Sequence, residues 1–174
     1  MITIISGTNR KKANSYKVAT QYKAILKSKG SDAQIIDLEE LPADFLTTAF
    51  YENVGKNSRF QSMIESVSQA EKLVFIVPEY NGSFPGILKM FIDAMAFPSP
   101  LKGKKCALVG LSSGVQGSAL AMSHLTDIFN YLGMHVLAQK PKLSGIHERM
   151  SNGAVTDELG VQLLTEQAEA LLNF

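Results

Sequence analysis

A polar segment near the start of the chain carries residue types that can hold an anion. It reads SGTNRKKANS (6–15) and stands between a short apolar run and a helical pattern. The first N–H groups of a helix attract anions, because they lack partners and lie at the positive end of the helix dipole. An arginine can add two parallel charge-assisted hydrogen bonds to phosphate. We therefore expect a phosphate monoester here, bound by Ser6, Thr8, Arg10, Asn14 and Ser15.

Two known nucleotide fingerprints are absent from the chain. A Walker A loop requires G-x-x-x-x-G-K-[ST] and a dinucleotide site requires G-x-G-x-x-G, and the sequence contains neither pattern. The segment therefore favours one terminal phosphate over ATP or a dinucleotide, with Gly7 free to adopt a positive φ. A plainer interpretation stays open, in which Asn14 only caps the helix and Lys11 and Lys12 only face solvent.

A second segment, PEYNGSFPG (78–86), has the composition of a turn between a strand and a helix. Pro78 cannot donate to a strand ladder and should end the strand, and Gly82 can supply the turn. Ser83 can cap the following helix, which tolerates Pro85 in its first turn. A simple connecting turn would explain all of these residues.

The middle of this segment contains residues that a simple turn does not need, Tyr80 and Asn81. Backbone N–H and C=O groups there would line one wall of a crevice and could match a planar heterocycle with alternating donors and acceptors. Tyr80 could cover an apolar face of that ring, and the Glu79 carboxylate is interpreted as a surface or interface group. The residues expected to bind are Pro78, Glu79, Tyr80, Asn81 and Gly82.

The sequence around these polar segments predicts alternating strands and helices, which would position them. Short apolar runs without alternation are typical of parallel strands covered on both faces, and they occupy 2–5, 72–77 and 106–111, with weaker runs at 33–38 and 134–138. Apolar residues at helical spacing recur at 18–26, 88–95, 121–132 and 161–172. Five strands and five helices fit right-handed βαβ units in one domain, residues 1–174, without a linker. Ligands of such sheets bind beyond the carboxyl ends of the strands, where the polar segments stand.

Composition and the chain start limit the possible function classes. With 45% apolar residues, 19% charged residues and a net charge of +1, the chain lacks the basic excess of a nucleic-acid binder. The start MITIISGTNR has neither the basic region nor the apolar length of a signal peptide or membrane span, so we expect a cytoplasmic protein without membrane insertion. The one cysteine, Cys106, excludes an intrachain disulfide and should be a buried, unreactive strand residue. Two longer polar loops, 42–57 and 139–153, are candidates for lids or subunit contacts.

A competing pattern is GLSSG (110–114), which matches the G-x-S-x-G nucleophile elbow of serine hydrolases. Asp127 with His135 or His147 could nominally complete a triad. However, Asp127 falls in the middle of a helix and His135 opens a strand, which disfavours the hydrolase. Neither these histidines nor His124 forms a recognised ligand pair, so no metal site is expected.

Three segments together resemble one family. PEYNGSFPGILKMFID (78–93) resembles the signature P-E-Y-N-x-S-x-P-G-x-L-K-N-x-I-D of the NAD(P)H-dependent FMN reductases, flavodoxin-like flavoproteins that include quinone, azo-dye and chromate reductases. GTNRKKANSYKVA (7–19) is similar to the family's G-S-x-R-x-x-S-x-N-x-x-L-A, and SSGVQGSALA (112–121) is similar to the segment beside the flavin pyrimidine. The likeness extends over essentially the whole chain.

The resemblance implies a flavodoxin-like α/β sandwich of three layers, with a five-stranded parallel sheet in the order 2-1-3-4-5 and helices on both faces. It implies hydride transfer from NADPH or NADH through FMN to a quinone, free flavin or similar small acceptor by a ping-pong mechanism, without a catalytic side-chain acid or base. Thr8, Arg10 and Ser15 would hold the FMN phosphate, and Ser113, Gly114 and Gly117 would line the pyrimidine side. It also implies a homodimer or homotetramer, in which aromatic residues of the first long loop, Phe45, Phe50 and Tyr51, could take part or could instead be core.

Three positions depart from the family pattern. Ala13 replaces a phosphate-loop serine, Ser15 stands where asparagine is usual, and Met90 replaces a helix asparagine. Asn14 could supply part of the phosphate shell, so we expect changes in FMN affinity and in the donor set, though not in the location of the site. The other alternative is an electron carrier of flavodoxin type, which Arg10 in the phosphate loop and the near-neutral charge both disfavour.

Overall fold

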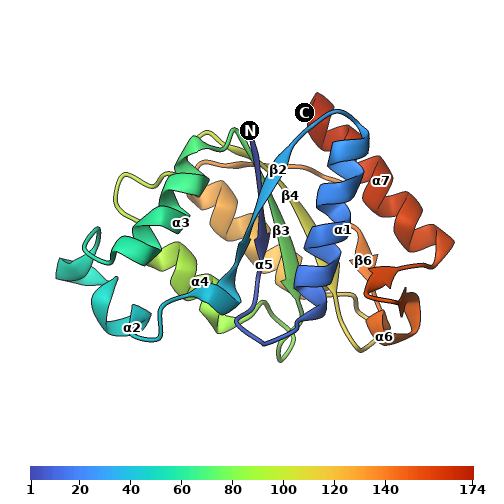
Figure 1. Cartoon of the computed structure of the whole chain (residues 1–174), viewed down its shortest axis with the longest axis horizontal. Coiled ribbons are helices and arrows are strands. Elements are labelled where there is room, and N and C mark those ends of the chain that lie inside the picture. Colours follow the sequence, from blue (N-terminus) through green and yellow to red (C-terminus); the bar gives the residue numbers. More distant parts are fainter.

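A parallel sheet forms the centre of the computed structural model, which describes residues 1–174 (Figure 1). Its strands lie in the order β2-β1-β3-β4-β5, and each neighbouring pair is parallel. The bounds are β1 Ile2–Ser6, β2 Ala33–Asp37, β3 Lys72–Pro78, β4 Lys105–Leu111 and β5 His135–Val136. The flavodoxin-like fold and strand order expected from the sequence are confirmed.

The last strand is shorter than expected and is interrupted. β5 pairs with the start of β4 only, and a second short strand, β6 (Lys142–Leu143), pairs with the end of the same β4. Between them the chain leaves the sheet edge and returns through Pro141, whose carbonyl accepts the N–H of Gly110 at 2.9 Å. Within the run predicted over 134–138, only His135–Val136 form a strand, and the sheet edge is completed by β6 after Pro141, which cannot itself donate to a ladder.

Helices cover both faces of the sheet (Figure 1). One face carries α1 and α7, and the other carries α3, α4 and α5. The bounds are α1 Asn14–Ser28, α3 Ser58–Gln69, α4 Gly86–Asp93, α5 Ala119–Tyr131 and α7 Glu158–Asn173. Four of these follow the helical patterns in the sequence, whereas α3 was not located there, although Phe60, Ile64 and Val67 are its buried face.

The two long polar loops contain short elements of their own. The first holds α2 (Phe45–Thr48) and a 3-10 turn (Tyr51–Asn53), and it follows another 3-10 turn, η1 (Leu38–Glu40). The second holds α6 (Ile146–Arg149) and a hairpin of β7 (Met150–Ser151) with β8 (Ala154–Val155). Phe45 is a core residue that packs against Phe60, with ring centroids 4.9 Å apart, whereas Tyr51 is 86% exposed.

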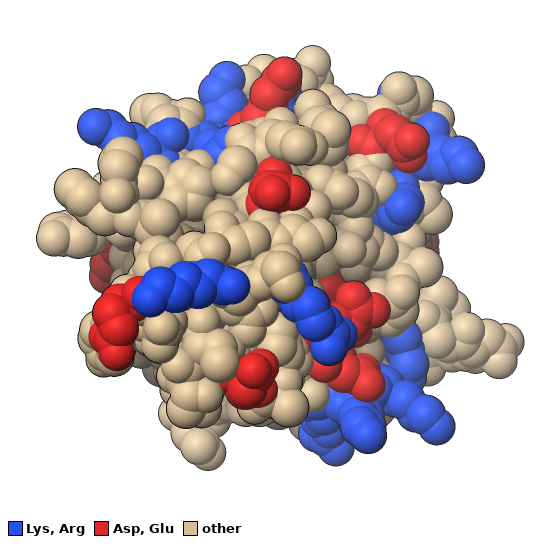
Figure 2. Space-filling view, turned by 60° about the vertical axis from the view of Figure 1, so that its left-hand side comes forward, with Lys and Arg blue, Asp and Glu red and all other residues tan.

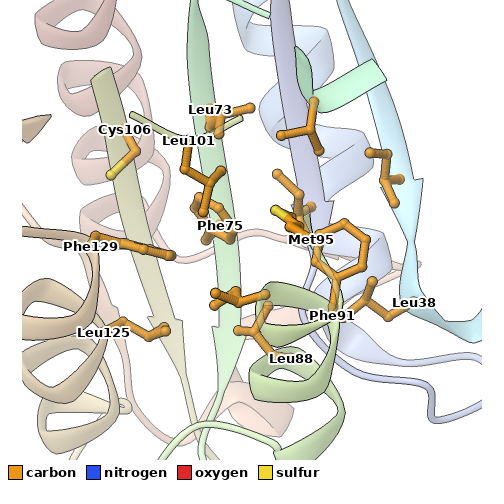
Figure 3. Packing of buried hydrophobic residues seen from close by; sticks show 14 of the residues in the cluster. Leu38, Leu73, Phe75, Leu88, Phe91, Met95, Leu101, Cys106, Leu125 and Phe129 are labelled. Carbon is orange, nitrogen blue, oxygen red and sulfur yellow. The ribbon is translucent and has the colours of Figure 1, made fainter. Parts of the chain in front are cut away.

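The core lies in two layers because successive strand residues point to opposite faces. From β3, Phe75 packs toward α4 and α5, with its ring 4.6 Å from that of Phe129 (Figure 3). Its neighbours Val74 and Ile76 pack on the face of α1 and α7. Cys106 of β4 is fully buried, as expected, and burial raises the pKa of its thiol to about 12. Burial on both faces explains why the strand sequences do not alternate.

Both termini lie at the amino edge of the sheet, opposite the edge where the strands end (Figure 1). The carbonyl of Met1 accepts the N–H of Glu71 there, and the carbonyl of Phe174 accepts from the ammonium of Lys105. Figure 2 shows basic and acidic side chains interspersed over one face of the molecule. None of the helices has the length and apolar character needed to cross a membrane.

Candidate functional site

A pocket of about 270 Å³ opens at the carboxyl edge of the sheet. It lies between the loops that follow β1, β3 and β4, with α6 at its side. Eight side chains expected at the site line it, namely Thr8, Arg10, Asn14, Ser15, Pro78, Glu79, Tyr80 and Ser113. The structure places the remaining five, Ser6, Asn81, Gly82, Gly114 and Gly117, outside this lining. The three loops named from the sequence therefore meet at one pocket, although five of the named residues do not line it.

The loop after β1 brings positive charge to the start of α1. Arg10, Lys11 and Lys12 line the pocket, and their charged groups take part in no ion pair of the protein. Asn14 is the first helical residue and does not cap the helix, because the N-cap is Ala13 and the Asn14 side chain accepts from Lys17 at 3.2 Å. The first turn of α1 thus keeps N–H groups that can bind an anion.

Backbone geometry in this loop differs from the expectation. Gly7 does not adopt a positive φ; instead its N–H donates to the carbonyl of Ile76 at 2.9 Å, and a Cβ would stand 2.8 Å from that oxygen. Lys12 is the residue with a positive φ, 54°, and its N–H donates to the carboxylate of Glu39 at 3.3 Å. Glycine is therefore needed for close approach between loop and strand rather than for a left-handed turn.

The loop after β3 forms a tight turn. Tyr80 and Ser83 exchange backbone hydrogen bonds of 2.8 and 3.0 Å, and the two residues between them, Asn81 and Gly82, both have positive φ. The N–H of Glu79 donates to the carbonyl of Leu111 at 2.9 Å. The N–H groups of Glu79 and Tyr80 therefore have partners within the protein, whereas those of Asn81 and Gly82, outside the pocket lining, have none.

Helix α5 holds this turn through two side-chain contacts. The Glu79 carboxylate accepts the N–H of Ser118 at 3.0 Å, and the Ser83 hydroxyl lies 2.9 Å from Nδ1 of His124. Ser83 does not cap α4, as the sequence had suggested, because Pro85 occupies the N-cap position of that helix. The Glu79 side chain is thus a structural anchor between two loops rather than a simple surface group.

Tyr80 bridges the first two loops. Its hydroxyl lies 2.9 Å from that of Thr8, and the Thr8 hydroxyl also accepts the N–H of Arg10 at 3.3 Å. Tyr80 itself is 38% exposed. The contact brings an aromatic ring to the same pocket as the basic loop, and a flat ligand with an anionic arm would meet both.

The loop after β4 does not present a serine nucleophile. Ser112, the serine of the G-x-S-x-G match, is buried, donates to the carbonyl of Gly114 at 2.8 Å and accepts the N–H of Gly117 at 2.9 Å. Gly117 has a φ of 58°, and a Cβ there would stand 2.7 Å from Cβ of Lys142. Gly117 therefore serves packing, while the N–H groups of Ser113 and Gly114 are free of protein partners.

Sequence reasoning missed one side of the pocket. Ile146 and His147 of α6 line it, and Nε2 of His147 lies 3.1 Å from the Ser113 hydroxyl. The available signal was that loop 139–153 follows the last strand and so starts at the carboxyl edge. Lys11, Lys12, Ala13, Leu111 and Ser112 complete the lining. No cluster of side chains suited to a metal ion occurs in the chain.

Two buried hydroxyl groups meet where α1 packs on β1. Ser6, expected to touch a ligand, is fully buried, and its hydroxyl lies 3.1 Å from that of Ser15 on α1. Asp37 of β2 is the register partner of Ser6, and its carboxylate accepts the N–H of Glu39 at 3.2 Å. Burial raises the pKa of Asp37, and the hydrogen bond from the Glu39 N–H partly offsets that rise.

Comparisons of the sequence with known proteins point in one direction. The family described as NADPH-dependent FMN reductase matches residues 1–147. An NAD(P)H-dependent FMN reductase of Pseudomonas aeruginosa is 32% identical over 173 residues, which cover 96% of this chain and 90% of that protein. A quinone reductase of Escherichia coli K12 is 33% identical over 125 residues, which cover 69% of this chain and 66% of that enzyme.

Solved structures support the same fold. A flavoenzyme NAD(P)H:(acceptor) oxidoreductase of Paracoccus denitrificans superposes with a TM-score of 0.77 at 22% identity, covering 99% of this chain and 94% of that one. A flavodoxin from the domain Archaea superposes with a TM-score of 0.64 at 17% identity, covering 99% of both chains. At these identities the likeness concerns the fold, so the archaeal flavodoxin does not by itself favour an electron carrier.

Proposed function

The chain belongs to the NADPH-dependent FMN reductase family, and we propose that it binds FMN at the carboxyl edge as a single domain, residues 1–174. In this proposal it passes electrons from NADPH or NADH to a quinone, free flavin or similar small acceptor. The observation that carries the proposal is the basic loop at the start of α1, where Arg10, Lys11 and Lys12 line the pocket without ion-pair partners. A terminal phosphate would satisfy these cations and the first N–H groups of the helix.

The residues present fit an FMN phosphate at one end of the pocket. Thr8, Arg10 and Ser15 offer two hydroxyls and a guanidinium on that side, and Asn14 lies beside them. Ala13 brings no side-chain oxygen, so the N–H groups of the helix start take a larger share of the binding. Met90, the third departure from the family pattern, packs against the core and does not line the pocket.

The other end fits a flat ring with polar edges. The N–H of Ser113, which lines the pocket, is free, and so are those of Asn81, Gly82 and Gly114, which lie in the adjoining loops just outside the lining. Tyr80 can lie against a ring face. The free N–H groups favour negative charge on a ring edge, as donors of an oxyanion hole do.

The bound FMN supplies the hydride chemistry, and the protein supplies binding and orientation. The proposal assigns no side-chain acid or base, and the one carboxylate in the lining, Glu79, instead accepts the N–H of Ser118. If NAD(P)H and the acceptor use the same open face in turn, the kinetics are ping-pong. A carrier of flavodoxin type would instead need a partner protein to receive its electrons.

We extend the proposal to a homodimer or homotetramer in the cytoplasm. Support for assembly comes from an apolar groove between α4 and α5, where Phe97 is 99% exposed and Tyr131 is 91% exposed. Covering these rings would remove apolar surface from water. The molar mass from light scattering after size exclusion tests this, and a monomer at all concentrations would contradict it.

The visible spectrum of the purified protein, with mass analysis of the released cofactor, tests the main proposal. We expect flavin absorption, FMN as the released species, and steady NADPH consumption with a benzoquinone and no partner protein. A colourless protein that takes up no FMN when this is supplied in excess would contradict the proposal. Bound FMN without NAD(P)H oxidation by any small acceptor would favour the carrier.

A further inference from the structure

The hydroxyl group of Thr8 joins two loops of the pocket, and its hydrogen-bonding capacity is only partly used. Its oxygen accepts the N–H of Arg10 at 3.3 Å and lies 2.9 Å from the hydroxyl oxygen of Tyr80. A threonine hydroxyl has one proton to donate and two lone pairs that accept. The protein therefore fills two of these three positions. Thr8 is 1% exposed and lines the pocket, so a partner for the third position has to come from the pocket.

The direction of the bond between Thr8 and Tyr80 decides which kind of ligand the third position accepts. If Thr8 donates to Tyr80, its remaining lone pair is left for a donor in the pocket. If Tyr80 donates to Thr8, both lone pairs of Thr8 are occupied and its proton is left for an acceptor. Either oxygen can be the donor by geometry alone. The two directions therefore select ligands of opposite chemistry.

Two properties of the site favour Tyr80 as the donor. A phenol hydroxyl is more acidic than an alcohol, and it is therefore the stronger donor of the pair. Arg10, Lys11 and Lys12 line the same pocket, and none of them forms an ion pair. Their charge attracts an anion, and the oxygens of a phosphate accept hydrogen bonds. An anion in the pocket takes the Thr8 proton and leaves Tyr80 as the donor to Thr8.

The fold itself sets the short distance between Tyr80 and Thr8. The N–H of Gly7, the neighbour of Thr8, donates to the carbonyl of Ile76 on β3 at 2.9 Å. Tyr80 follows the end of the same strand, in the turn closed by its two backbone hydrogen bonds with Ser83. Because both loops are fastened to β3, the two hydroxyls are held together by the protein, and a ligand has little ordering left to impose on them.

We propose that Tyr80 is a positioning residue for the phosphate of FMN and that it acts through Thr8. The Tyr80 hydroxyl donates to Thr8, and the Thr8 hydroxyl then donates to the phosphate. This inference rests on the proposed function, because it takes the phosphate of FMN as the ligand. It goes further by giving the Tyr80 hydroxyl a task separate from the contact of its ring with the flavin, and by assigning part of the selection of FMN over riboflavin to the loop after β3.

The decisive variant is Tyr80→Phe, which keeps the aromatic ring and removes only the hydroxyl. The Thr8 oxygen then loses a donor, and its proton is no longer directed to the pocket. We expect the variant to bind FMN about threefold to tenfold more weakly than the wild-type protein, the range of one net hydrogen bond. Riboflavin, which lacks the phosphate, should bind equally well to both proteins. Titration of the flavin-free proteins, followed by flavin fluorescence, measures these dissociation constants.

A matched control removes a different phenol hydroxyl. Tyr16 lies in the first turn of α1, is 44% exposed and does not line the pocket. Tyr16→Phe should therefore leave the affinities for FMN and riboflavin unchanged.

Variants of Thr8 test whether the Tyr80 hydroxyl acts through this residue. Thr8→Val removes the hydroxyl at nearly constant side-chain volume. In the Thr8→Val background, Tyr80→Phe should change FMN affinity by less than about twofold, because the path to the phosphate is already broken. Thr8→Ser keeps the hydroxyl and should preserve the full effect of Tyr80→Phe. Thermal melting of each variant checks that it is folded.

The possible results separate this inference from the proposed function. Equal losses of FMN and riboflavin affinity in Tyr80→Phe would show that the hydroxyl acts on the ring, and would overturn the inference while leaving FMN binding intact. Unchanged FMN affinity in Tyr80→Phe, or a loss that persists in the Thr8→Val background, would overturn it as well. Failure of the wild-type protein to bind any flavin would overturn the proposed function, and this inference with it.

Discussion

The two edges of the sheet both gather basic side chains, but they use them differently. At the amino edge the ammonium of Lys72 donates to the carbonyls of Leu171 and Leu172 at 2.9 and 2.7 Å. Lys104 donates to the carbonyls at the end of α3, and Lys105 to that of the last residue. At the carboxyl edge the cations of residues 10–12 line a pocket and form no ion pair.

The difference follows from the direction of the helices. In a parallel sheet with crossover helices, each helix begins at the carboxyl edge and ends at the amino edge. A helix end offers unpaired carbonyls and attracts lysine, whereas a helix start offers N–H groups and attracts anions. Lysines at the amino edge therefore become internal parts of the fold, and cations at the carboxyl edge remain available for a ligand.

The largest effect should come from removing a cation at the carboxyl edge. Arg10→Ala should weaken FMN binding by about tenfold to a hundredfold, as expected for a lost hydrogen bond to a charged group. Titration of the apoprotein with FMN, followed by flavin fluorescence, measures this. Arg59→Ala, at an exposed position on α3, is the matched control and should have no effect. Comparable losses of FMN and riboflavin affinity would show that Arg10 does not bind the phosphate.

The reverse pattern is expected at the amino edge. Lys72→Met should lower the free energy of unfolding by about 1–2 kcal/mol, because two carbonyls at the end of α7 lose their donor. Urea unfolding measures the change, with the exposed Lys56→Met as the comparison. The affinity of Lys72→Met for FMN should equal that of the wild type. A change in FMN affinity without a change in stability would contradict the separate roles of the basic residues at the two edges of the sheet.

The histidines offer a smaller test of the same distinction. His147→Gln should weaken the binding of both FMN and riboflavin by about twofold to fivefold, because His147 contacts Ser113 in the pocket. His135→Gln, at the start of β5 on the amino edge, should leave both affinities unchanged. Isothermal titration of the two variants provides the check, and equal effects would exclude a role for the contact with Ser113.

The smallest effect is expected for Cys106, a buried group near the amino edge. Since burial raises the pKa of its thiol to about 12, little thiolate exists at pH 8. Ellman's reagent should therefore react with the native protein only as fast as it unfolds, whether FMN is present or not. Rapid labelling of the folded protein would contradict the burial of this residue.

Much of the fold could be predicted because its signals are local. The apolar runs of β1, β3 and β4 and the turn residues after them are contiguous in the sequence, so strand positions and the three pocket loops followed directly. The helix α3 was missed although its apolar spacing is regular. The weakest run, 134–138, gave the largest error, because only two of its residues pair with β4 and the rest of that sheet edge is formed by β6, beyond the predicted run.

The details of the site depend on contacts between distant segments. The hydrogen bond from the Glu79 N–H to the carbonyl of Leu111 depends on the register of β3 with β4. The contact between the hydroxyls of Ser6 and Ser15 requires the packing of α1 on β1. The approach of His147 to Ser113 requires the path of the chain after β6. The spacing of residues within a single segment does not encode such pairs. Residue types therefore suggested the chemistry of the site, but not which hydrogen-bonding groups already have partners within the protein.

The position of the two chain ends has a practical consequence for handling the protein. Any sequence joined to Met1 or Phe174 would leave the molecule at the amino edge of the sheet (Figure 1), whereas the pocket is lined by loops at the carboxyl edge. A purification tag, a fused redox partner or a linker to an electrode surface could therefore be attached at either end without obstructing the entry of small substrates.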